Sequence, residues 1–552
     1  MSTKRKVIVT SALPYANNRP HVGHIAGAYL PADIYVRFLR MQGVDTKFIC
    51  GSDDYGVAIM LTAQKEGKTP AEVAKYYNAE QQKAFDALDI KFDIYGSTSR
   101  NPYHTEVAQT FFKNIFDKGF FEKQRSKQFY DEKTKTFLPD RFVKGTCSYC
   151  GTADQNGDQC ENCGNVLDTE TLKEAISVLS GEPAKIAETV EWLLDLSKFK
   201  SQVESWLEIA KVREGTKKFV KGLISTGLVK RSMTRDISWG IPVPLEDPEA
   251  KGKVLYVWFD APIGYISNTI QEVTENSGTV EQGKELWQSK DIEHYHFIGE
   301  DNSIFHCVIW IAMLCAEGSY KLPDGVIVNN FLNIQFVGQE EQKMSKSRGT
   351  AVFIEDYLEA GGEVDALRYY LTMVAPEKAR TAFKPDDLEQ RRNSELADVL
   401  GNLVNRIVSF GKKNFGPNSP KKHQQKISEI DTEFQDSILS CHKDVTDLLE
   451  SFQFKAALER CMLLARSANV YVDKTAPWKA FKVDVDRAET ILALTLDSIK
   501  SLAVMLEPFI PTTALKLQSI LGLKELCWND AITGLSEGNP LGEAIILFPK
   551  VT

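Results

Sequence analysis

Two histidines stand three residues apart near the start of the chain, His21 and His24, with Gly23 between them. Residues 7–10 ahead of them are rich in β-branched side chains, which favours a buried strand, and residues 25–41 behind them carry apolar side chains at helical spacing. A strand, a tight turn and a helix N-terminus can hold an anion, because free N–H groups and the helix dipole point at it. The pair therefore indicates an anion site, although two polar residues in a turn would explain it equally well.

A second group of candidate residues lies far along the chain, in the sequence Lys-Met-Ser-Lys-Ser that begins at Lys343. It follows an apolar stretch at 325–336 that is typical of a strand, and a turn at Gly338. The pattern places two ammonium groups, those of Lys343 and Lys346, on one polar loop. Taken alone, this loop is explained as a solvated basic surface.

Together, the histidine pair and the lysine loop resemble the two signature elements of class I aminoacyl-tRNA synthetases, in the same order and at a comparable separation. The stretches Ala-Leu-Pro-Tyr-Ala-Asn at 12–17 and Tyr-Val-Trp-Phe-Asp-Ala-Pro-Ile-Gly-Tyr at 256–265 narrow the likeness to the methionyl-tRNA synthetase family. The resemblance covers nearly the whole chain. It implies an α/β fold, with a Rossmann-like parallel-sheet catalytic domain that is split by a zinc-binding connective insertion and followed by an α-helical anticodon-binding bundle.

The resemblance, with the spacing of apolar residues, divides the chain into five segments. We expect the first half of the catalytic domain at 1–118, the connective insertion at 119–230, the second half of the catalytic domain at 231–336, the lysine loop with a stem-contact fold at 337–388, and the anticodon-binding domain at 389–552. The insertion is too short to include the separate editing domain of the isoleucine, valine and leucine enzymes.

The apolar spacing also predicts individual elements. We expect helices within 70–120 and 171–228, sheet strands at 47–50 and through 235–240 and 256–265, and bundle helices at 394–413, 429–452, 455–472 and 487–520.

Four cysteines form two Cys-x2-Cys-Gly turns, at Cys147, Cys150, Cys160 and Cys163. Such turns bring four sulfurs within tetrahedral reach of a zinc ion, and each glycine permits the close turn of the backbone. Disulfides are the formal alternative, but a chain without a secretion signal should keep these thiols reduced. Because sulfur fills all four positions, we expect one structural zinc ion per chain.

The resemblance also implies a binding site for L-methionine. The matching residues are Leu13, Tyr15, Trp258, Ala261, Pro262, Tyr265, His306 and Trp310, with Asp53 as the carboxylate that holds the ammonium group. An apolar pocket rich in aromatic rings suits a polarizable thioether. Without the resemblance, such aromatic residues are more often plain core and Asp53 is equally well explained by a turn. Glu300 and Asn302 depart from the bacterial pattern, which has lysine and an apolar residue at these two positions. The resemblance therefore does not predict the polarity of the pocket.

For ATP, the resemblance implies contacts from His21, Gly23, His24, Lys343, Ser345 and Lys346. Formation of methionyl-adenylate is an in-line displacement at the α-phosphorus, so positioning and charge stabilisation suffice and no side-chain nucleophile is needed. His21 and His24 would donate hydrogen bonds to phosphates, and Lys343 and Lys346 would stabilise the departing pyrophosphate, with the larger effect from Lys346. Mg²⁺ should accompany ATP, held chiefly by phosphate oxygens.

Two residues of the helical C-terminal part match positions that read the anticodon of tRNA(Met), including the initiator tRNA. Asn405 would donate or accept hydrogen bonds, and Trp478 would stack on a base. Where the bacterial family has arginine four residues after this asparagine, the chain has Ser409, so Arg406 is the candidate substitute. Without the resemblance, Trp478 is explained as an aromatic cap of the bundle.

Composition bounds these interpretations. At 552 residues and 43% hydrophobic residues, the chain should contain several domains with sizeable cores. The formal net charge of −9 argues against a nucleic-acid partner, unless basic pairs such as Arg391-Arg392, Lys412-Lys413 and Lys421-Lys422 reach phosphates locally. No apolar run approaches the roughly 20 residues of a membrane span. We therefore expect a cytoplasmic protein with no membrane partner, and a monomer.

Three other functions compete with this interpretation: a different class I synthetase, a small-molecule nucleotidyltransferase with the same histidine element, and a zinc-knuckle protein that binds nucleic acid without catalysis. A nucleotidyltransferase needs no anticodon-binding bundle. A binding protein leaves the lysine loop unexplained. Exchange of labelled pyrophosphate into ATP that depends on an amino acid separates all three, because only a synthetase requires its amino acid.

Overall fold

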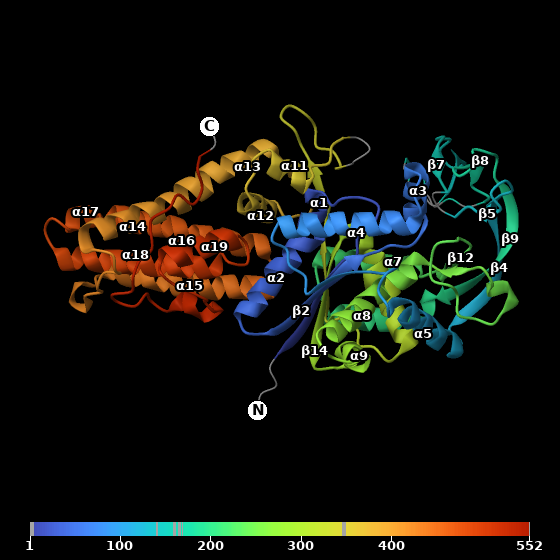
Figure 1. The fold of residues 1–552 in the computed structure, drawn as a ribbon, viewed down its shortest axis with the longest axis horizontal. Helices are drawn as coiled ribbons and strands as arrows, with labels where there is room; N and C mark the ends of the chain where they lie inside the picture. Colours follow the sequence, from blue (N-terminus) through green and yellow to red (C-terminus); the bar gives the residue numbers. More distant parts are fainter. Residues whose placement is uncertain are drawn as a thin grey trace.

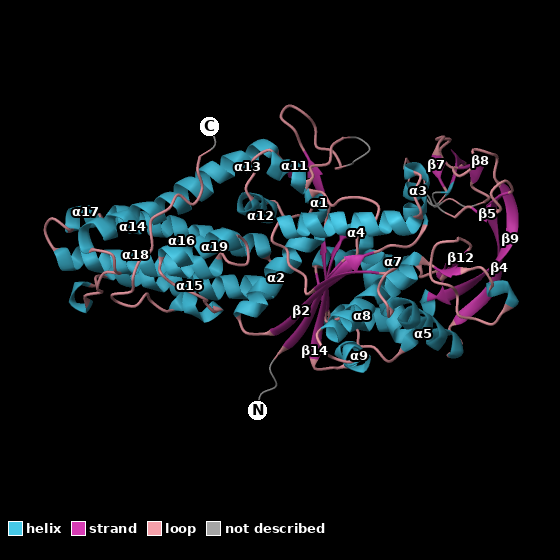
Figure 2. Cartoon of the chain, viewed as in Figure 1, coloured by secondary structure: helices cyan, strands magenta, loops and turns pink. Residues whose placement is uncertain are grey.

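The computed structural model describes residues 5–139, 142–157, 160, 162–163, 167, 169–344 and 349–550. The molecule is elongated, with a helical bundle at one end, a parallel sheet in the middle and small antiparallel sheets at the other end (Figure 1, Figure 2). The expected α/β class, with a Rossmann-like core and a helical C-terminal part, is confirmed. Among the helices of the described segments, none combines the length and apolar character needed to cross a bilayer.

Six parallel strands form the central sheet, in the order β10-β15-β14-β1-β2-β3. Their bounds are β1 Lys6–Ser11, β2 Asp45–Ser52, β3 Ile94–Ser97, β10 Lys211–Val212, β14 Ile292–Gly299 and β15 Gly325–Asn329. Strand order reverses between β1 and β14, which pair directly, with Ile8 beside His294. In a sheet of this kind, ligands bind outside the carboxyl ends of the strands at this reversal.

Alternate side chains of the strands enter different cores, as the two-residue period of a strand requires. Val7 and Val9 pack with Phe38 on one face, and Ile8 packs with Ile266 on the other. The first face is covered by α1 Val22–His24, the π-helical turn η1 Ile25–Tyr29, α2 Leu30–Met41 and α4 Pro70–Ala87. The second is covered by α5 His104–Asp117, α8 Val257–Glu275, α9 Val280–Gln288, the π-helical turn η6 Phe305–Ile309 and α10 Trp310–Glu317.

Between α5 and the second half of the sheet, the chain forms two small antiparallel sheets at the right of Figure 1. The larger has the order β11-β9-β4-β5 and the smaller β7-β6-β8. Their strands are β4 Phe121–Asp131, β5 Thr136–Phe137, β6 Val143–Cys147, β7 Gln155–Asn156, β8 Leu172–Ser177, β9 Lys185–Asp195 and β11 Lys230–Ser232. The helical segments of this part of the chain are η3 Leu196–Phe199, α6 Lys200–Ile209 and α7 Glu214–Thr226. The earlier helix α3 Val57–Glu66 packs against the core of the smaller sheet.

Three sequence predictions about elements are wrong. The stretch 171–228 is helical only from Leu196, because Val190, Trp192 and Leu194 are buried at alternate positions and form the strand β9. Residues 257–265 are not a strand but the first part of α8, whose buried Phe259, Ile263 and Ile266 recur every three or four residues. The sheet strand predicted through 235–240 is also wrong: it is limited to β12 Thr234–Arg235, which pairs antiparallel with β13 Val254–Leu255 outside the central sheet. The strand β3 also lies within the range 70–120, between the helices α4 and α5.

After the parallel pair β16 Leu332–Ile334 and β17 Thr381–Phe383, the chain is helical. The connecting helices are α11 Ile354–Glu359, α12 Val364–Met373 and α13 Pro385–Arg391. The bundle consists of η7 Arg392–Gly401, α14 Asn402–Phe415, α15 Glu429–Glu450, α16 Phe454–Thr475, α17 Pro477–Ala480, α18 Val485–Met505 and α19 Pro511–Ile520, with short turns at η8 Gln424–Lys426 and η9 Trp528–Ile532. The first three bundle helices are confirmed as expected. The stretch 487–520 is divided between α18 and α19, with Pro508 and Pro511 at the division.

The bundle and the sheet domain share one core. The ring of Phe38 on α2 packs edge-on against Trp528, with the two centroids 4.8 Å apart. Beside them, the buried Arg368 of α12 pairs with Asp33 of α2 at 2.6 Å and donates hydrogen bonds to the carbonyl oxygens of Pro508 and Phe509. Packing and ion pairing therefore hold the bundle firmly against the helix that follows the histidine turn.

Candidate active site

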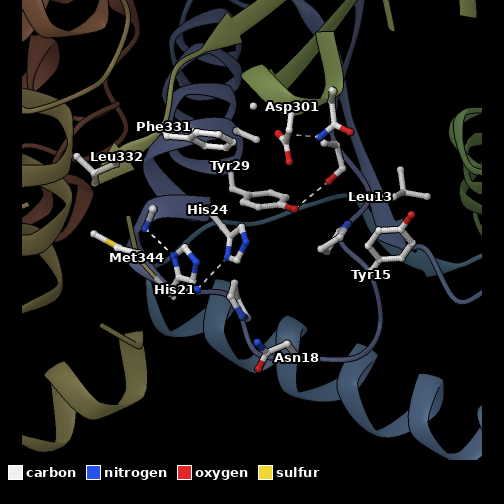
Figure 3. A pocket seen from close by; sticks show the side chains of 18 of the residues that line it. Leu13, Tyr15, Asn18, His21, His24, Tyr29, Asp301, Phe331, Leu332 and Met344 are labelled. Atoms are coloured by element: carbon white, nitrogen blue, oxygen red, sulfur yellow. Dashed lines mark hydrogen bonds between the residues drawn. The ribbon is translucent and has the colours of Figure 1, made fainter. Parts of the chain in front are cut away.

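A cavity of about 460 Å³ opens at the carboxyl ends of β1 and β14, where the strand order reverses. Figure 3 shows its lining, which comes from the turn after β1, the end of β14, the segment around β16 and the start of the lysine loop. The labelled residues are Leu13, Tyr15, Asn18, His21, His24, Tyr29, Asp301, Phe331, Leu332 and Met344. Residues from four distant parts of the sequence thus meet at the place where such a sheet binds ligands.

The two histidines lie side by side on this wall, with their rings stacked at 3.8 Å between centroids. Nδ1 of His21 accepts a hydrogen bond from the N–H of Gly23 at 3.1 Å, and Nδ1 of His24 accepts one from the N–H of His21 at 3.2 Å. Gly23 must be small, because a β-carbon there would lie 2.9 Å from Cε1 of His21. Since both Nδ1 atoms are acceptors, the hydrogen of each neutral ring is on Nε2.

Loss of solvation by the packing around the cavity keeps both rings neutral at pH 7, although His24 is exposed on the cavity side. This loss of solvation lowers the pKa of His21 to about 2, with further lowering by His24 and Lys343, and it lowers the pKa of His24 to about 4. Each ring therefore offers one N–H donor at Nε2 without adding a fixed positive charge. Such donors can stabilise negative charge that develops on a phosphate.

Lys343 and Met344 are the described residues of the Lys-Met-Ser-Lys-Ser sequence. Nζ of Lys343 lies 4.9 Å from the ring centroid of Phe331. The chain returns from the loop beside the histidines, because the N–H of Val22 donates to the carbonyl of Val352 at 2.9 Å. Ser345 and Lys346 lie outside the described residues. The structure thus brings Lys343 to the same cavity as His21, Gly23 and His24.

A second, smaller cavity of about 20 Å³ adjoins the first. It is lined by Leu13, Asp53, Trp258, Ala261, Pro262, Tyr265 and His306 of the expected methionine residues, together with Ala12, Asn302 and Phe305. Tyr15 contacts it through Trp258, edge-on at 6.2 Å between centroids. Trp310 does not line either cavity: it is fully buried and stacks on Phe111. The two cavities share Ala12, Leu13, Asp53, Trp258 and Asn302.

The polar groups of the small cavity are largely satisfied within the protein. Nδ1 of His306 lies 3.2 Å from the carbonyl oxygen of Asn302, so it carries the hydrogen, and Nε2 accepts from the hydroxyl of Tyr265 at 2.8 Å. Burial lowers the pKa of His306 to about 4, which keeps this arrangement neutral. With Trp258 stacked on Phe305 at 3.6 Å, the pocket presents apolar and aromatic surface to a ligand.

Asp53 is the exception, because it is a buried carboxylate at the junction of the two cavities. Its carboxylate accepts a long hydrogen bond, 3.4 Å, from the N–H of Tyr55. Burial raises its pKa, and the neighbouring carboxylates Asp260 and Asp54 raise it further. A cation placed beside Asp53 would relieve this repulsion, so the site favours an ammonium group.

The four cysteines converge in the insertion. Sγ of Cys147 lies 3.8 Å from Sγ of Cys163, Sγ of Cys150 lies 3.6 Å from Sγ of Cys160, and all four sulfurs lie within 4.8 Å of one another. All are free thiols, so the disulfide alternative is not what the structure has. A tetrahedron with Zn–S bonds of about 2.3 Å has sulfur–sulfur edges of roughly 3.8 Å, so the spacing fits this metal.

Comparison with known proteins decides the family. A model described as "tRNA synthetases class I (M)" matches residues 7–408, and one described as "Anticodon binding domain of methionyl tRNA ligase" matches residues 422–552. The chain belongs to the methionyl-tRNA synthetase family of class I synthetases. A relative from Parabacteroides distasonis named "Methionine--tRNA ligase" is 40% identical over 99% of this chain and 79% of its own length, and one from Porphyromonas gingivalis with the same name is 41% identical over the same shares.

Solved structures of the family share the fold. The chain resembles "Mycobacterium tuberculosis methionyl-tRNA synthetase in complex with methionyl-adenylate" with a TM-score of 0.80 and 24% identity, over 99% of this chain and 100% of that one. The free-state structure of the same enzyme gives a TM-score of 0.74 at 22% identity, over 100% and 99%.

The anticodon residues expected for the family lie near one end of the bundle, at the left of Figure 1 where α14 and α17 are labelled. Asn405 and Arg406 are exposed on α14, and the guanidinium of Arg406 lies 5.3 Å from the ring centroid of the half-buried Trp478. Ser409 donates to Asn405 at 3.4 Å. The side chain proposed to replace the missing arginine therefore lies beside the proposed stacking ring.

The basic pairs named in the sequence are mostly engaged within the protein. Arg391 pairs with Asp387 and Glu395, and Arg392 with Glu363. Lys412, Lys421 and Lys422 pair with Glu543, Glu537 and Asp497, respectively. Five of these six basic side chains therefore already have acidic partners within the protein.

Sequence reasoning missed two lining residues and an ion pair near them. Phe305 stacks on Trp258, and the ring of Phe331 lies 4.9 Å from Nζ of Lys343. Arg380, which also lies beside Phe331, pairs with Glu300. Phe305 could have been found as the residue before His306. The pairing of Arg380 has no local signal, because its partner is 80 residues away.

Proposed function

We propose that the protein activates L-methionine with ATP to give methionyl-adenylate and pyrophosphate, and then transfers methionine to the 3′ end of tRNA(Met). The observation that carries this proposal is the pair of adjoining cavities. One cavity is lined by two neutral histidines and Lys343. The other is lined by aromatic residues, with the buried carboxylate of Asp53 at the junction of the two cavities. An α-phosphate and an amino acid can therefore meet between them.

In this proposal, the thioether occupies the pocket between Trp258 and Tyr265, and Asp53 holds the ammonium group. The methionine carboxylate then faces the α-phosphate of ATP in the larger cavity. Its oxygen forms a bond to phosphorus as the bond to the pyrophosphate oxygen breaks. The Nε2–H groups of His21 and His24 and the ammonium of Lys343 stabilise the charge that develops on the phosphates. Lys346 would join them from the part of the loop outside the described residues.

Mg²⁺ would accompany ATP, since this hard cation binds substrate phosphates and keeps several of its waters. Zinc would be held by Cys147, Cys150, Cys160 and Cys163, as one ion per chain. With sulfur at all four positions there is no place for a reactive water, so the role we propose for zinc is structural.

The bundle would read the anticodon of tRNA(Met). Asn405 and Arg406 offer hydrogen bonds next to Trp478, which offers a ring face for base stacking. The proposed division of the chain follows the segments given for the sequence: catalytic halves at 1–118 and 231–336, an insertion at 119–230, a connector at 337–388 and the anticodon-binding domain at 389–552.

Exchange of labelled pyrophosphate into ATP tests the reaction. We expect exchange with L-methionine, and little or none with isoleucine, valine or leucine. Exchange that depends on another amino acid would identify a different synthetase. Exchange that depends on no amino acid but on another small acceptor would identify a nucleotidyltransferase, and charging of tRNA(Met) distinguishes the complete ligase from both.

A further inference from the structure

One aromatic ring at the mouth of the larger cavity has two cations beside it. The ring is Phe331, between β15 and β16, and it is visible on the cavity wall in Figure 3. Nζ of Lys343 lies 4.9 Å from the ring centroid, and Cζ of Arg380 lies 5.3 Å from the same centroid. Both distances are within the range of a cation–π interaction, about 6 Å.

The backbone fixes Arg380 beside this ring. Leu332 of β16 pairs with Thr381 of β17, so the residues just before each of them, Phe331 and Arg380, are neighbours across the ladder. The N–H of Thr381 also donates to the carbonyl oxygen of Phe331 at 3.4 Å. The contact between Arg380 and the ring therefore depends on strand pairing and not only on a long, mobile side chain.

Glu300 fixes the other side of Arg380. Its Oε1 accepts from Nε of Arg380 at 2.8 Å and lies 2.8 Å from Nη2. Glu300 begins the short turn η5 Glu300–Asn302, which follows β14 and supplies Asp301 and Asn302 to the cavity wall. Glu300, which departs from the bacterial pattern, thus has a partner of opposite charge on the connector.

Charge explains why both Arg380 and Glu300 matter for the position of Lys343. A guanidinium paired with a carboxylate repels a nearby ammonium weakly, so the ring can attract Lys343. If Glu300 lost its charge, the uncompensated Arg380 would repel Lys343. If Arg380 lost its charge, Glu300 would compete with the ring for the ammonium group.

We propose that Arg380, anchored by Glu300, is a positioning residue for Lys343 and acts through the ring of Phe331. It touches no reacting atom. It keeps the ammonium at the cavity mouth, where the proposed function needs it, and so couples the turn after β14 and the connector strand β17 to the lysine loop. The inference rests on the role of Lys343 in the proposed function.

The test compares full-length Arg380→Gln, Glu300→Gln, the double variant with both changes, and Phe331→Leu, with the rate of adenylate formation measured by rapid quench. We expect each of Arg380→Gln and Glu300→Gln to slow this step on the order of fivefold, the size of one cation–π contact, while methionine affinity and melting temperature stay unchanged. The double variant should lose less than the product of the two single losses. Arg380→Gln should cost nothing further when combined with Phe331→Leu, and Arg380→Lys should restore most of the rate.

A matched control is Lys123→Gln in β4. Lys123 lies 5.6 Å from the ring of Trp192 and pairs with Asp247 and Glu249, so it is the same kind of contact, but in the insertion away from both cavities. It should leave the rate unchanged. The proposal would be overturned if the losses of the two single variants multiplied in the double variant, or if Arg380→Gln still slowed adenylate formation in the Phe331→Leu background. A loss in Lys123→Gln equal to that in Arg380→Gln would also overturn it.

A second readout does not use the reaction. The rate at which acetic anhydride labels Nζ of Lys343, followed by mass spectrometry, should rise about twofold in Arg380→Gln and Glu300→Gln and stay constant in Lys123→Gln. Unchanged labelling would refute the positioning role. Absence of methionine-dependent exchange in the unaltered protein would refute the proposed function instead, so the two failures are distinct.

Discussion

At the residue scale, two backbone N–H groups decide what His21 and His24 can donate. Each N–H donates to Nδ1 of one ring, and desolvation lowers both pKa values well below the usual value of 6.5. Two protonated rings with centroids 3.8 Å apart would repel each other. Each protonated ring would also carry two N–H donors, and both would need an acceptor. The neutral pair instead presents two Nε2–H donors, which gain strength only when negative charge develops on a phosphate.

This tautomer makes a prediction for His24. The amide nitrogen of glutamine can occupy the position of Nε2, whereas that of asparagine lies near the position of Nδ1. We expect His24→Ala to slow adenylate formation on the order of 10²–10³-fold, as loss of one donor to a transition-state oxyanion does. His24→Gln should recover part of this loss and His24→Asn should not.

The measurement is the single-turnover rate of adenylate formation, with methionine affinity as the control, because His24 does not line the smaller cavity. Equal rates for the glutamine and asparagine variants, or a faster asparagine variant, would show that the hydrogen is not on Nε2.

At the element scale, the insertion needs support beyond its own core. The apolar cluster around its small sheet is limited, and two of the proposed zinc ligands, Cys147 and Cys160, are themselves among its buried residues. Small modules of this kind often depend on a metal for part of their folding free energy. Metal binding and packing are therefore coupled in the strands β6 and β8.

We predict about one zinc ion per chain by elemental analysis and a lower melting temperature after chelation. Cys150→Ser should lower the zinc content, because it replaces a thiolate ligand with a hydroxyl group. The matched control is Cys527→Ser, an exposed cysteine outside the cluster, which should retain the metal. Metal-free protein from a preparation without chelator, or a mass that shows disulfides, would contradict the zinc site.

Elements also show where sequence reasoning succeeded. The histidine turn, β1 and the two cysteine turns were predictable because short-range chemistry specifies them: a strand before a helix N-terminus, and two glycine-terminated thiol pairs. The β9 strand was missed because the whole stretch 171–228 was assigned from a helical pattern that begins only at Leu196. The aromatic residues of 256–265 favour strands by propensity, yet they are helical in α8, because packing of the fully buried run 259–270 against β2, β3, α5 and α9 overrides that propensity. Contacts such as Arg380 with Glu300 arise only when distant elements pack.

At the scale of the whole molecule, the contact between the sheet domain and the bundle fixes the position of the bundle relative to the active site. Arg37 of α2 pairs with Asp33, Asp89 and Glu507, and Arg368 crosses from α12 to the same Asp33. These ion pairs lie around a shared apolar core. Separation of one of these ion pairs would leave a buried charge uncompensated, so the contact between the sheet domain and the bundle resists bending. A contact at the bundle end is thus held in a fixed relation to the active site.

The proposed anticodon contact of Trp478 can be tested against this arrangement. If a base stacks on the ring, Trp478→Ala should weaken tRNA(Met) binding by about 1–3 kcal/mol and lower charging efficiency accordingly. Trp478→Phe should retain most of the binding. Methionine-dependent pyrophosphate exchange uses no tRNA and should be unchanged, because the ring is far from both cavities.

A plain packing role for Trp478 makes the opposite prediction. Truncation of a core tryptophan costs roughly 3–5 kcal/mol of folding stability, so the melting temperature would fall before any specific contact was lost. The ring is only half-buried, and the guanidinium of Arg406 lies over it, so we expect a smaller loss of stability than this. Leu515→Ala, an exposed apolar residue of α19, is the control for truncation on the bundle surface. Normal charging by Trp478→Ala would rule out the anticodon contact, and a melting temperature that falls far below that of the control would assign the residue to packing.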